Sequence, residues 1–351
     1  MRRKTKEVKI NNCIIGGDHP VAIQSMLNTI TTDTEASCRQ IDELLSAGCD
    51  IIRFAVPDIK SAEAVYEYKN RFPLVPFVAD IHFDHRIALK CIEAGIDKIR
   101  INPGNIGSEE GVAAVAAAAK SKNVPIRIGV NGGSLEKHIL DKYGSPTAEA
   151  LAESAFYHAS LLNKYDFDNI VISVKSSDIK TMIQANRIIS EKCEYPLHLG
   201  VTEAGTRSQG TVKNAVGIGS LLCDGIGDTI RVSLTDDPVN EVKAAKELLE
   251  ALDMSDELIS VVSCPTCGRT QIDLIKLCDE FEKIKANLHP SRKIRVALMG
   301  CVVNGPGEAR GCDIGIAGGK NEALLFKNGE PLYKVQYDKI LQTLKEEINK
   351  L

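Results

Sequence analysis

Three cysteines and a glutamate lie in two glycine- and proline-containing segments near the C-terminus. Cys264 and Cys267 form a C-x-x-C in "SCPTCGRT", and Cys301 and Glu308 belong to "GCVVNGPGEA". Each segment begins where an apolar, β-branched run ends, so both loops are expected at one end of a small sheet. Thiolates brought together in this way are ligands for a soft metal centre.

Two kinds of metal centre suit these loops. A structural zinc needs four ligands, usually cysteine or histidine, but neither loop contains a histidine and the nearest further cysteine is Cys312. An iron-sulfur cube can take three cysteines and a different fourth ligand, and Glu308 is placed to be an exchangeable oxygen ligand. The spacing favours an iron-sulfur cluster, while a zinc knuckle, a redox dithiol and an inert arrangement stay open.

The composition predicts a two-domain globular protein of the cytoplasm. The chain has 351 residues, 44% hydrophobic and 26% charged, and a net charge of -4. That charge gives no electrostatic footprint for nucleic acid or an anionic membrane, and no apolar stretch has the length of a signal or a membrane span. Eleven scattered cysteines in such a chain do not indicate a disulfide scaffold.

The first 254 residues have the pattern of a (β/α)8 TIM barrel. Eight short β-branched runs alternate with helical segments, and they begin near residues 21, 51, 75, 97, 124, 169, 195 and 227. Near-continuous apolar strands between helices are typical of a parallel sheet buried on both faces. A doubly wound open sheet is the alternative fold.

Polar residues at the predicted strand ends favour the barrel, because a barrel collects its active site at the C-terminal ends of all strands. Seven strands end in such residues: Arg53; Asp80 and His82; Arg100 and Asn102; Arg127 and Asn131; Ser173 and Lys175; Thr202 and Glu203; Arg231 and Ser233. Five cations from five strands repel one another unless an anion neutralises them, and guanidinium groups suit phosphate oxygens. The sequence therefore predicts a polyanionic substrate, such as a diphosphate.

Residues 255–351 predict a small α+β domain in the order β-α-β-β-β-β-α. The pattern changes after the helix "DDPVNEVKAAKELLEALD", and the cysteine segments follow the first two predicted strands. A hairpin turn is expected at Asn328-Gly329, and a helix closes the domain.

Taken together, "SCPTCGRT", "GCVVNGPGEA", "VTEAGT" and "RIGVNGGSL" resemble the bacterial 4-hydroxy-3-methylbut-2-enyl diphosphate synthases, in the compact two-domain form. The resemblance extends over essentially the whole chain. It implies reductive ring opening and dehydration of 2-C-methyl-D-erythritol 2,4-cyclodiphosphate in the methylerythritol phosphate route to isoprenoids. It also implies a 4Fe-4S cluster held by Cys264, Cys267, Cys301 and Glu308.

The same resemblance implies the substrate-binding residues, which are Arg53, Arg100, Arg127, Asn131, Lys175, Thr202 and Ser233. Glu203, beside Thr202 at a strand end, is the candidate acid that delivers a proton to the departing hydroxyl. Ferredoxin or flavodoxin is the expected electron donor. A head-to-tail homodimer is also expected, because the last barrel helix leads away from the mouth and no long linker follows it.

An alternative function is a non-redox phosphate-binding barrel, an aldolase or transferase, with a zinc-stabilised C-terminal module. A related possibility from another class is a pterin- or phosphate-binding barrel whose tail is an interaction module. A bound cluster would separate these from the redox enzyme.

Overall fold

The computed structural model describes residues 2–303 and 309–351. The chain divides into two compact units, Met1–Ser255 and Asp256–Leu351. The boundary expected from the sequence, between residues 254 and 255, lies one residue earlier.

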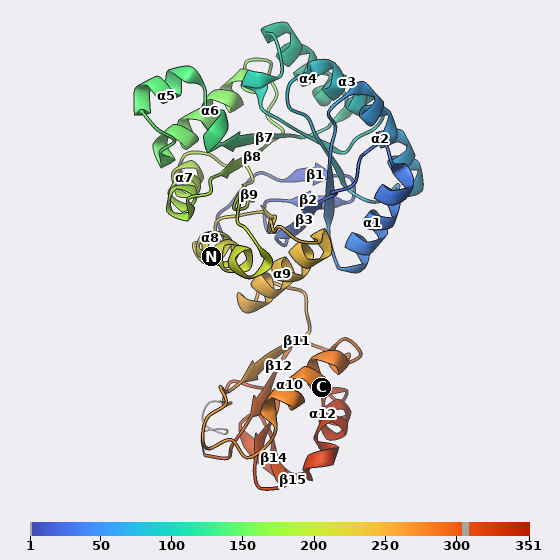
Figure 1. Cartoon of the computed structure of the whole chain (residues 1–351), viewed down its shortest axis with the longest axis vertical. Coiled ribbons are helices and arrows are strands. Elements are labelled where there is room, and N and C mark those ends of the chain that lie inside the picture. The colour runs from blue at the N-terminus through green and yellow to red at the C-terminus, as the bar shows by residue number, and fades with distance from the viewer. Residues whose placement is uncertain (1, 304–308) are drawn as a thin grey trace. The chain divides into compact units, whose positions relative to one another are not determined.

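The first unit is a parallel barrel, as predicted. Its sheet order is β8-β7-β6-β5-β4-β3-β10-β9, and a parallel bridge between Ile172 and Leu197 joins the two ends, which an open sheet would not have. Figure 1 shows the strands enclosed by a ring of helices. The strands are β3 (Ala22–Met26), β4 (Ile51–Ala55), β5 (Phe77–Asp80), β6 (Lys98–Ile101), β7 (Ile126–Asn131), β8 (Ile170–Lys175), β9 (His198–Leu199) and β10 (Thr229–Ile230).

Side-chain caps fix the starts of most barrel helices. Asp33, Asp58, Asp84, Ser108, Thr147, Asp178 and Asp237 each accept a hydrogen bond from a first-turn N–H, which satisfies a donor that the helix itself leaves free. The helices are α1 (Thr34–Ser46), α2 (Ile59–Arg71), α3 (His85–Glu93), α4 (Glu109–Lys122), α6 (Ala148–Asn163), α7 (Ile179–Lys192), α8 (Arg207–Cys223) and α9 (Pro238–Ala251). A short additional helix, α5 (Lys137–Tyr143), precedes α6.

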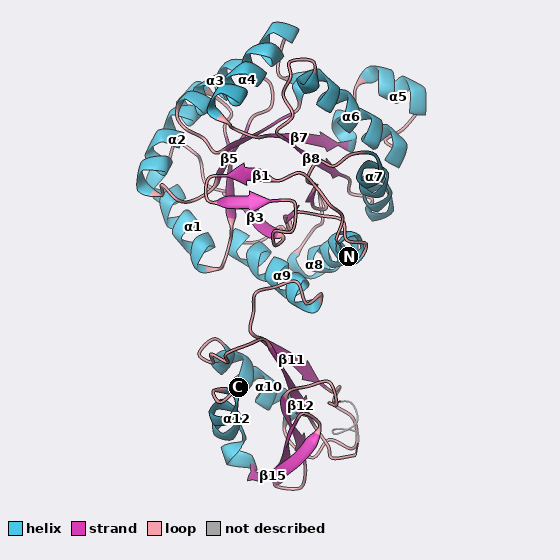
Figure 2. Ribbon diagram, turned by 180° about the vertical axis from the view of Figure 1, so that it is seen from behind, coloured by secondary structure: helices cyan, strands magenta, loops and turns pink. Residues whose placement is uncertain are grey.

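An N-terminal hairpin, which the sequence analysis did not predict, closes the lower end of the barrel. Strands β1 (Val8–Ile10) and β2 (Cys13–Ile15) pair antiparallel. Their side chains pack on one inward-facing apolar residue from each of four strands: Ala22, Ile51, Val78 and Val171. Figure 2 shows β1 lying across this end of the barrel. The mouth at the opposite end is therefore the open one.

The second unit is the predicted α+β domain. Its sheet has the order β11-β12-β13-β14-β15, with β11, β12 and β13 parallel and the last three strands antiparallel. The elements are β11 (Ile259–Ser263), α10 (Leu274–Lys285), β12 (Ile294–Met299), β13 (Ile314–Gly318), β14 (Glu322–Lys327), β15 (Glu330–Gln336) and α12 (Ile340–Ile348). Asn328 and Gly329 form the β14–β15 turn with φ of 51° and 79°, which fits the two-residue turn expected. No helix among the described residues is both long and apolar enough to cross a membrane.

Candidate active site

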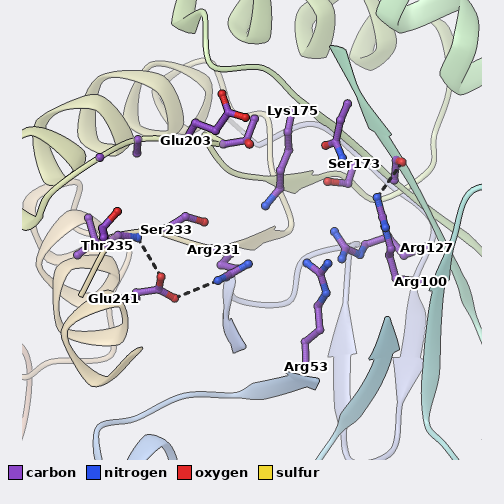
Figure 3. Close-up of a pocket in the computed structure, with 16 residues that line it drawn as sticks. Arg53, Arg100, Arg127, Ser173, Lys175, Glu203, Arg231, Ser233, Thr235 and Glu241 are labelled. Carbon is purple, nitrogen blue, oxygen red and sulfur yellow. Dashed lines mark hydrogen bonds and ion pairs between the residues drawn. The ribbon is translucent and has the colours of Figure 1, made fainter. Parts of the chain in front are cut away.

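The mouth of the barrel contains a cavity of about 320 Å³. All seven residues predicted to bind substrate line it, as does Glu203 (Figure 3). The complete lining is Arg53, Arg100, Arg127, Gly129, Asn131, Ser173, Lys175, Thr202, Glu203, Ala204, Gly205, Arg231, Ser233, Leu234, Thr235 and Glu241.

Strand register explains why these side chains meet. Alternate residues of a strand face the barrel interior, and paired residues on parallel neighbours lie side by side and point the same way. Asp80, Arg100 and Arg127 are paired in register across β5, β6 and β7. Asn131 is likewise paired with Lys175 across β7 and β8. The backbone ladder alone therefore brings several charged groups side by side.

Asp80 joins two of the arginines from behind the cavity. Its carboxylate accepts from Arg53 Nη2 at 2.5 Å and from Arg100 Nη1 at 3.1 Å. Burial alone would raise the pKa of Asp80, but Arg53, His82 and Arg100 together hold it well below its usual range. Asp80 is therefore ionised, and it offsets part of the positive charge at the mouth.

Glu241 forms a corresponding ion pair with Arg231, and the sequence analysis did not identify Glu241 as a site residue. It lies in the first turn of α9, which begins after the N-cap Asp237. Acidic residues are common in a first turn because they interact favourably with the helix dipole, so Glu241 did not stand out. Its side chain accepts from Arg231 Nη2 at 3.4 Å and from the N–H of Leu234 at 2.9 Å. The sequence offers no signal for this role, because the burial of Glu241 and its contact with Arg231 appear only in the folded chain.

Arg127 and Lys175 make no ion pair with any described residue. Arg127 is 1% exposed and Lys175 is 8% exposed. Burial, reinforced by Arg231 and Arg127, lowers the pKa of Lys175 well below its usual range. Figure 3 shows the Lys175 side chain pointing into the space bordered by Arg53 and Arg231. These two cations are the ones that an incoming anion would neutralise most fully.

Glu203 stands at the rim of the cavity on the loop after β9. The residue is exposed, and its backbone φ is +55°, a region that a non-glycine side chain rarely occupies. Gly205, two residues later, has φ of +100°. The loop thus holds the Glu203 carboxylate at the mouth in a conformation that costs backbone energy.

Besides Asp80, two polar strand-end residues do not line the cavity. His82 is half exposed and lies with Nε2 3.3 Å from Asp80 Oδ2. Asn102 accepts a hydrogen bond from the N–H of Gly104 and so shapes the turn after β6. Both residues support neighbouring groups rather than face the cavity.

The cysteine loops of the second unit follow β11 and β12, which are adjacent and parallel. Cys264 Sγ accepts from the N–H of Gly300 at 3.2 Å, which connects the first loop to the residue before Cys301. Cys301 is buried and Cys267 is exposed, and the backbone N–H of Arg269 lowers the pKa of the Cys267 thiol. Glu308 lies outside the described residues.

The other two cysteines of this unit lie outside the two loop segments, although Cys264 packs against the same apolar clusters as both of them. Cys278 is on α10, and Cys312 is buried in a small apolar cluster with Ala309 and Phe326. Among the described residues, no three His, Cys, Asp or Glu side chains are grouped closely enough to hold one metal ion.

Solved structures with low sequence identity share the fold. A sialic acid synthetase from Leptospira borgpetersenii is 15% identical, with a TM-score of 0.51 over 82% of this chain and 99% of that chain. An HPPK-DHPS protein from Plasmodium falciparum is 13% identical, with a TM-score of 0.52 over 80% of this chain and 51% of that chain. At this identity the likeness concerns the fold alone.

Sequence comparison gives much closer relatives. A protein of Fusobacterium nucleatum is 56% identical over 99% of this chain and 98% of its own length. One from Clostridium perfringens is 57% identical over 98% of this chain and 97% of its own length. Both carry the name 4-hydroxy-3-methylbut-2-en-1-yl diphosphate synthase (flavodoxin).

Family models match both units of the chain. The GcpE TIM-barrel domain matches residues 5–246, and the GcpE protein C-terminal domain matches residues 260–350. The chain therefore belongs to the GcpE family, the family of these diphosphate synthases.

Proposed function

We propose that the protein is a 4-hydroxy-3-methylbut-2-en-1-yl diphosphate synthase. It opens the ring of 2-C-methyl-D-erythritol 2,4-cyclodiphosphate, with two electrons and two protons entering and one water leaving. The observation that carries the proposal is the cavity whose lining includes Arg127 and Lys175, two buried cations without a described anionic partner. Family membership does not favour the alternative of a non-redox barrel with a zinc-stabilised module.

The diphosphate is bound at the mouth by Arg53, Arg100, Arg127, Asn131, Lys175, Thr202 and Ser233. Arg127 and Lys175 supply the uncompensated charge, whereas Arg53 and Arg100 are already held by Asp80. Guanidinium groups fixed in this way present donors to phosphate oxygens without having to be ordered first. The carboxylates Asp80 and Glu241 thus position the arginines that surround the substrate.

Glu203 supplies the proton for loss of the substrate hydroxyl. Its carboxyl group is at the rim of the same cavity, within a loop that the backbone holds in one conformation. Replacing Glu203 with Gln removes the proton and little volume. We expect kcat to fall at least about 100-fold while the affinity for pyrophosphate changes less than about threefold. Unchanged kcat would remove Glu203 from the mechanism.

A 4Fe-4S cluster is held by Cys264, Cys267 and Cys301, with Glu308 as its fourth ligand. The donor chemistry of the described loops fits such a group: three thiols follow two adjacent strands, and the Gly300 N–H bonds to Cys264 sulfur as backbone donors do in cluster sites. When bound, the cluster would pass the two electrons of the reduced carrier to the substrate one at a time and would supply a Lewis-acidic iron. The reaction requires a redox-active group to bring electrons to the substrate, and the cluster is that group.

Flavodoxin is the electron donor that the relatives' names state, and we propose it for this chain. Ferredoxin was the other donor expected from the sequence. Turnover with each reduced carrier separately distinguishes the two.

The active unit is a head-to-tail homodimer, in which the cluster domain of each chain serves the barrel of the other. Helix α9 begins after β10 at the mouth and leads the chain about 20 Å away from it. Exposed apolar residues support docking on both units: Ile30 and Phe83 on the loops after β3 and β5, and Val302 and Val303 beside Cys301.

Anaerobic reconstitution of the whole chain tests the reaction. The protein is expected to show broad visible absorbance and to convert the cyclodiphosphate to the open-chain diphosphate with reduced flavodoxin, as seen by mass spectrometry. A colourless protein with one zinc per chain and no product would reject the proposal.

Subunit complementation tests the homodimer. Chains carrying Glu203→Gln are mixed with chains carrying Cys301→Ser under conditions that allow subunit exchange. If the cluster serves the partner's barrel, one site of the mixed dimer combines an intact barrel with an intact cluster, and activity returns. Inactive mixtures in which heterodimers are shown by mass spectrometry would mean that each cluster serves its own barrel.

A further inference from the structure

Below the mouth cavity, the barrel contains a second polar level that the proposed reaction does not use. We define this inner layer as Gln24, Lys98 and His198. Strand alternation turns all three inward. Lys98 stands two residues before Arg100, and Gln24 stands two before Met26, which is paired with Arg53. His198 stands two before Gly200, where an added Cβ would lie 2.7 Å from Lys175 Nζ.

The inner layer is buried and short of hydrogen-bond partners. Gln24 is 1% exposed, and Lys98 and His198 are 0% exposed. Within the described residues, no partner is found for Gln24 Nε2 and Oε1, Lys98 Nζ or His198 Nε2, nor for Nε and Nη2 of Arg127 above them. Only His198 Nδ1 is bonded, to Thr229 Oγ1 at 2.8 Å. Buried polar atoms normally have a partner, so this level requires an explanation.

An apolar floor closes the inner layer from below. Lys98 is paired with Val78, which packs with Ala22, Ile51 and the N-terminal hairpin. Of the side chains in the hairpin, Cys13 is the one whose charge would act on Lys98. Burial raises the pKa of the Cys13 thiol to about 11. Cys13 is therefore a neutral thiol and does not supply a negative charge to the layer.

The groups that act on Lys98 from the other elements are cations. Burial, then Arg127 and also Arg53, lower the pKa of Lys98 well below its usual range, and burial with Arg127 and Lys175 does the same for His198. Arg127 itself stays protonated in proteins. The interior carboxylates Asp80 and Glu241 are engaged by Arg53, Arg100 and Arg231. The inner layer thus has several donors, the positive charge of Arg127 directly above it and no anion of its own among the described residues, and a bound anion would favour the protonated form of Lys98.

We propose that the inner layer binds one small monovalent anion, of which chloride is the abundant example, between Lys98, Gln24 and Arg127. The anion accepts from the Lys98 ammonium, the Gln24 amide and the Arg127 guanidinium. A water molecule would satisfy some of these donors but would leave the buried positive charge uncompensated. The site lies below the diphosphate cavity and shares Arg127 with it, but it does not depend on the proposed reaction.

Bromide identifies the anion directly. Crystals of the whole chain grown in sodium bromide, with pyrophosphate filling the cavity, are measured at the bromine absorption edge. We expect an anomalous peak within hydrogen-bonding distance of Lys98 Nζ. Bromide confined to the mouth cavity, or density at the inner layer without anomalous signal, would overturn the proposal. Absence of pyrophosphate from the cavity would count against the proposed function instead.

Substitution of Lys98 tests the site in solution. With pyrophosphate present, chloride is expected to raise the unfolding temperature by about 2 °C over gluconate at equal ionic strength. The shift should disappear in Lys98→Met, whose side chain has similar length and no charge. It should persist in Lys9→Met, a matched change at an exposed lysine of the hairpin.

If Lys98→Met does not fold, Lys98→Gln is the second variant, because it keeps a donor and removes the charge. A chloride shift or a bromide peak that survives either folded substitution would show that Lys98 does not bind the anion, and would refute the proposal.

Discussion

The barrel mouth and the cysteine loops are built in different ways. At the mouth, charged side chains come from strands whose register places them side by side, and buried carboxylates hold the arginines in place. In the loops, Cys267 is exposed, and the described bonds between the two segments run to Gly300 rather than from one cysteine to another: the Gly300 N–H bonds to Cys264 Sγ, and the Gln271 N–H bonds to the Gly300 carbonyl. The mouth is therefore preorganised by the chain itself, whereas the loops depend on the group that they bind. This difference predicts that the two sites respond separately to mutation.

The largest expected effect concerns the cysteine loops. Serine at Cys264, Cys267 or Cys301 should abolish the visible absorbance after anaerobic reconstitution and lower turnover by more than about 1,000-fold, because each change removes a thiolate ligand. Pyrophosphate affinity, measured by calorimetry, should stay within about twofold, since the barrel is unchanged.

Cys278→Ser and Cys312→Ser are the matched controls and should keep the absorbance. Bleaching by Cys312→Ser would mean that Cys312 rather than Glu308 is a ligand. A large loss of pyrophosphate affinity in the Cys301 variant would contradict the independence of the two sites.

The next effect concerns Asp80, which holds two arginines at the mouth. Asp80→Asn should lower the free energy of unfolding by about 3 kcal/mol at pH 7, because it leaves Arg53 and Arg100 without their buried anion. The folded-state pKa of Asp80 lies below its unfolded value, so its stabilisation is present above about pH 4 and is lost as the pH falls. The difference between wild type and variant in urea unfolding should therefore shrink below that pH. A constant difference down to pH 3 would contradict this role.

A smaller effect should separate two classes of arginine at the same mouth. Arg127→Met is expected to weaken pyrophosphate binding about 100-fold, because no described carboxylate offsets the charge of Arg127. Arg231→Met should weaken binding only about 10-fold, because Glu241 already offsets that charge. Isothermal titration calorimetry of both variants measures the two losses of pyrophosphate affinity and so their ratio. Equal losses would mean that the carboxylates do not set the contribution of each cation.

The sequence predicted the regular parts of the fold and the mouth, since these follow from local rules. All eight barrel strands were expected, and Arg53 and Lys175 were placed at strand ends because they lie within or directly after apolar, β-branched runs. The N-terminal hairpin was missed because each of its two strands has only three residues, which is too short to give a periodic signal.

The missed site residues depend on contacts across the chain. Glu241 lies in a helix, and only tertiary packing shows that it faces Arg231 rather than solvent. Lys98 and His198 lie in short strands, and a polar residue in a short strand predicts a position at the edge of a sheet. Their burial follows from barrel closure, which joins residues far apart in sequence. The positive φ of Glu203 has no sequence signature, since glutamate is not a residue that favours it.

The smallest expected effect tests whether Glu203 is held under backbone strain. Asparagine tolerates a left-handed φ better than glutamate or glutamine, so Glu203→Asn should raise the free energy of unfolding by about 0.5 kcal/mol. Glu203→Gln is the matched control, because it removes the same charge while keeping the backbone preference of the original residue, and its stability should be unchanged. Both variants should lose turnover through loss of the carboxyl group. Urea unfolding of the two proteins side by side isolates the backbone contribution. Equal stabilities would show that φ of +55° costs nothing here, and that the position of Glu203 is set by the surrounding loop alone.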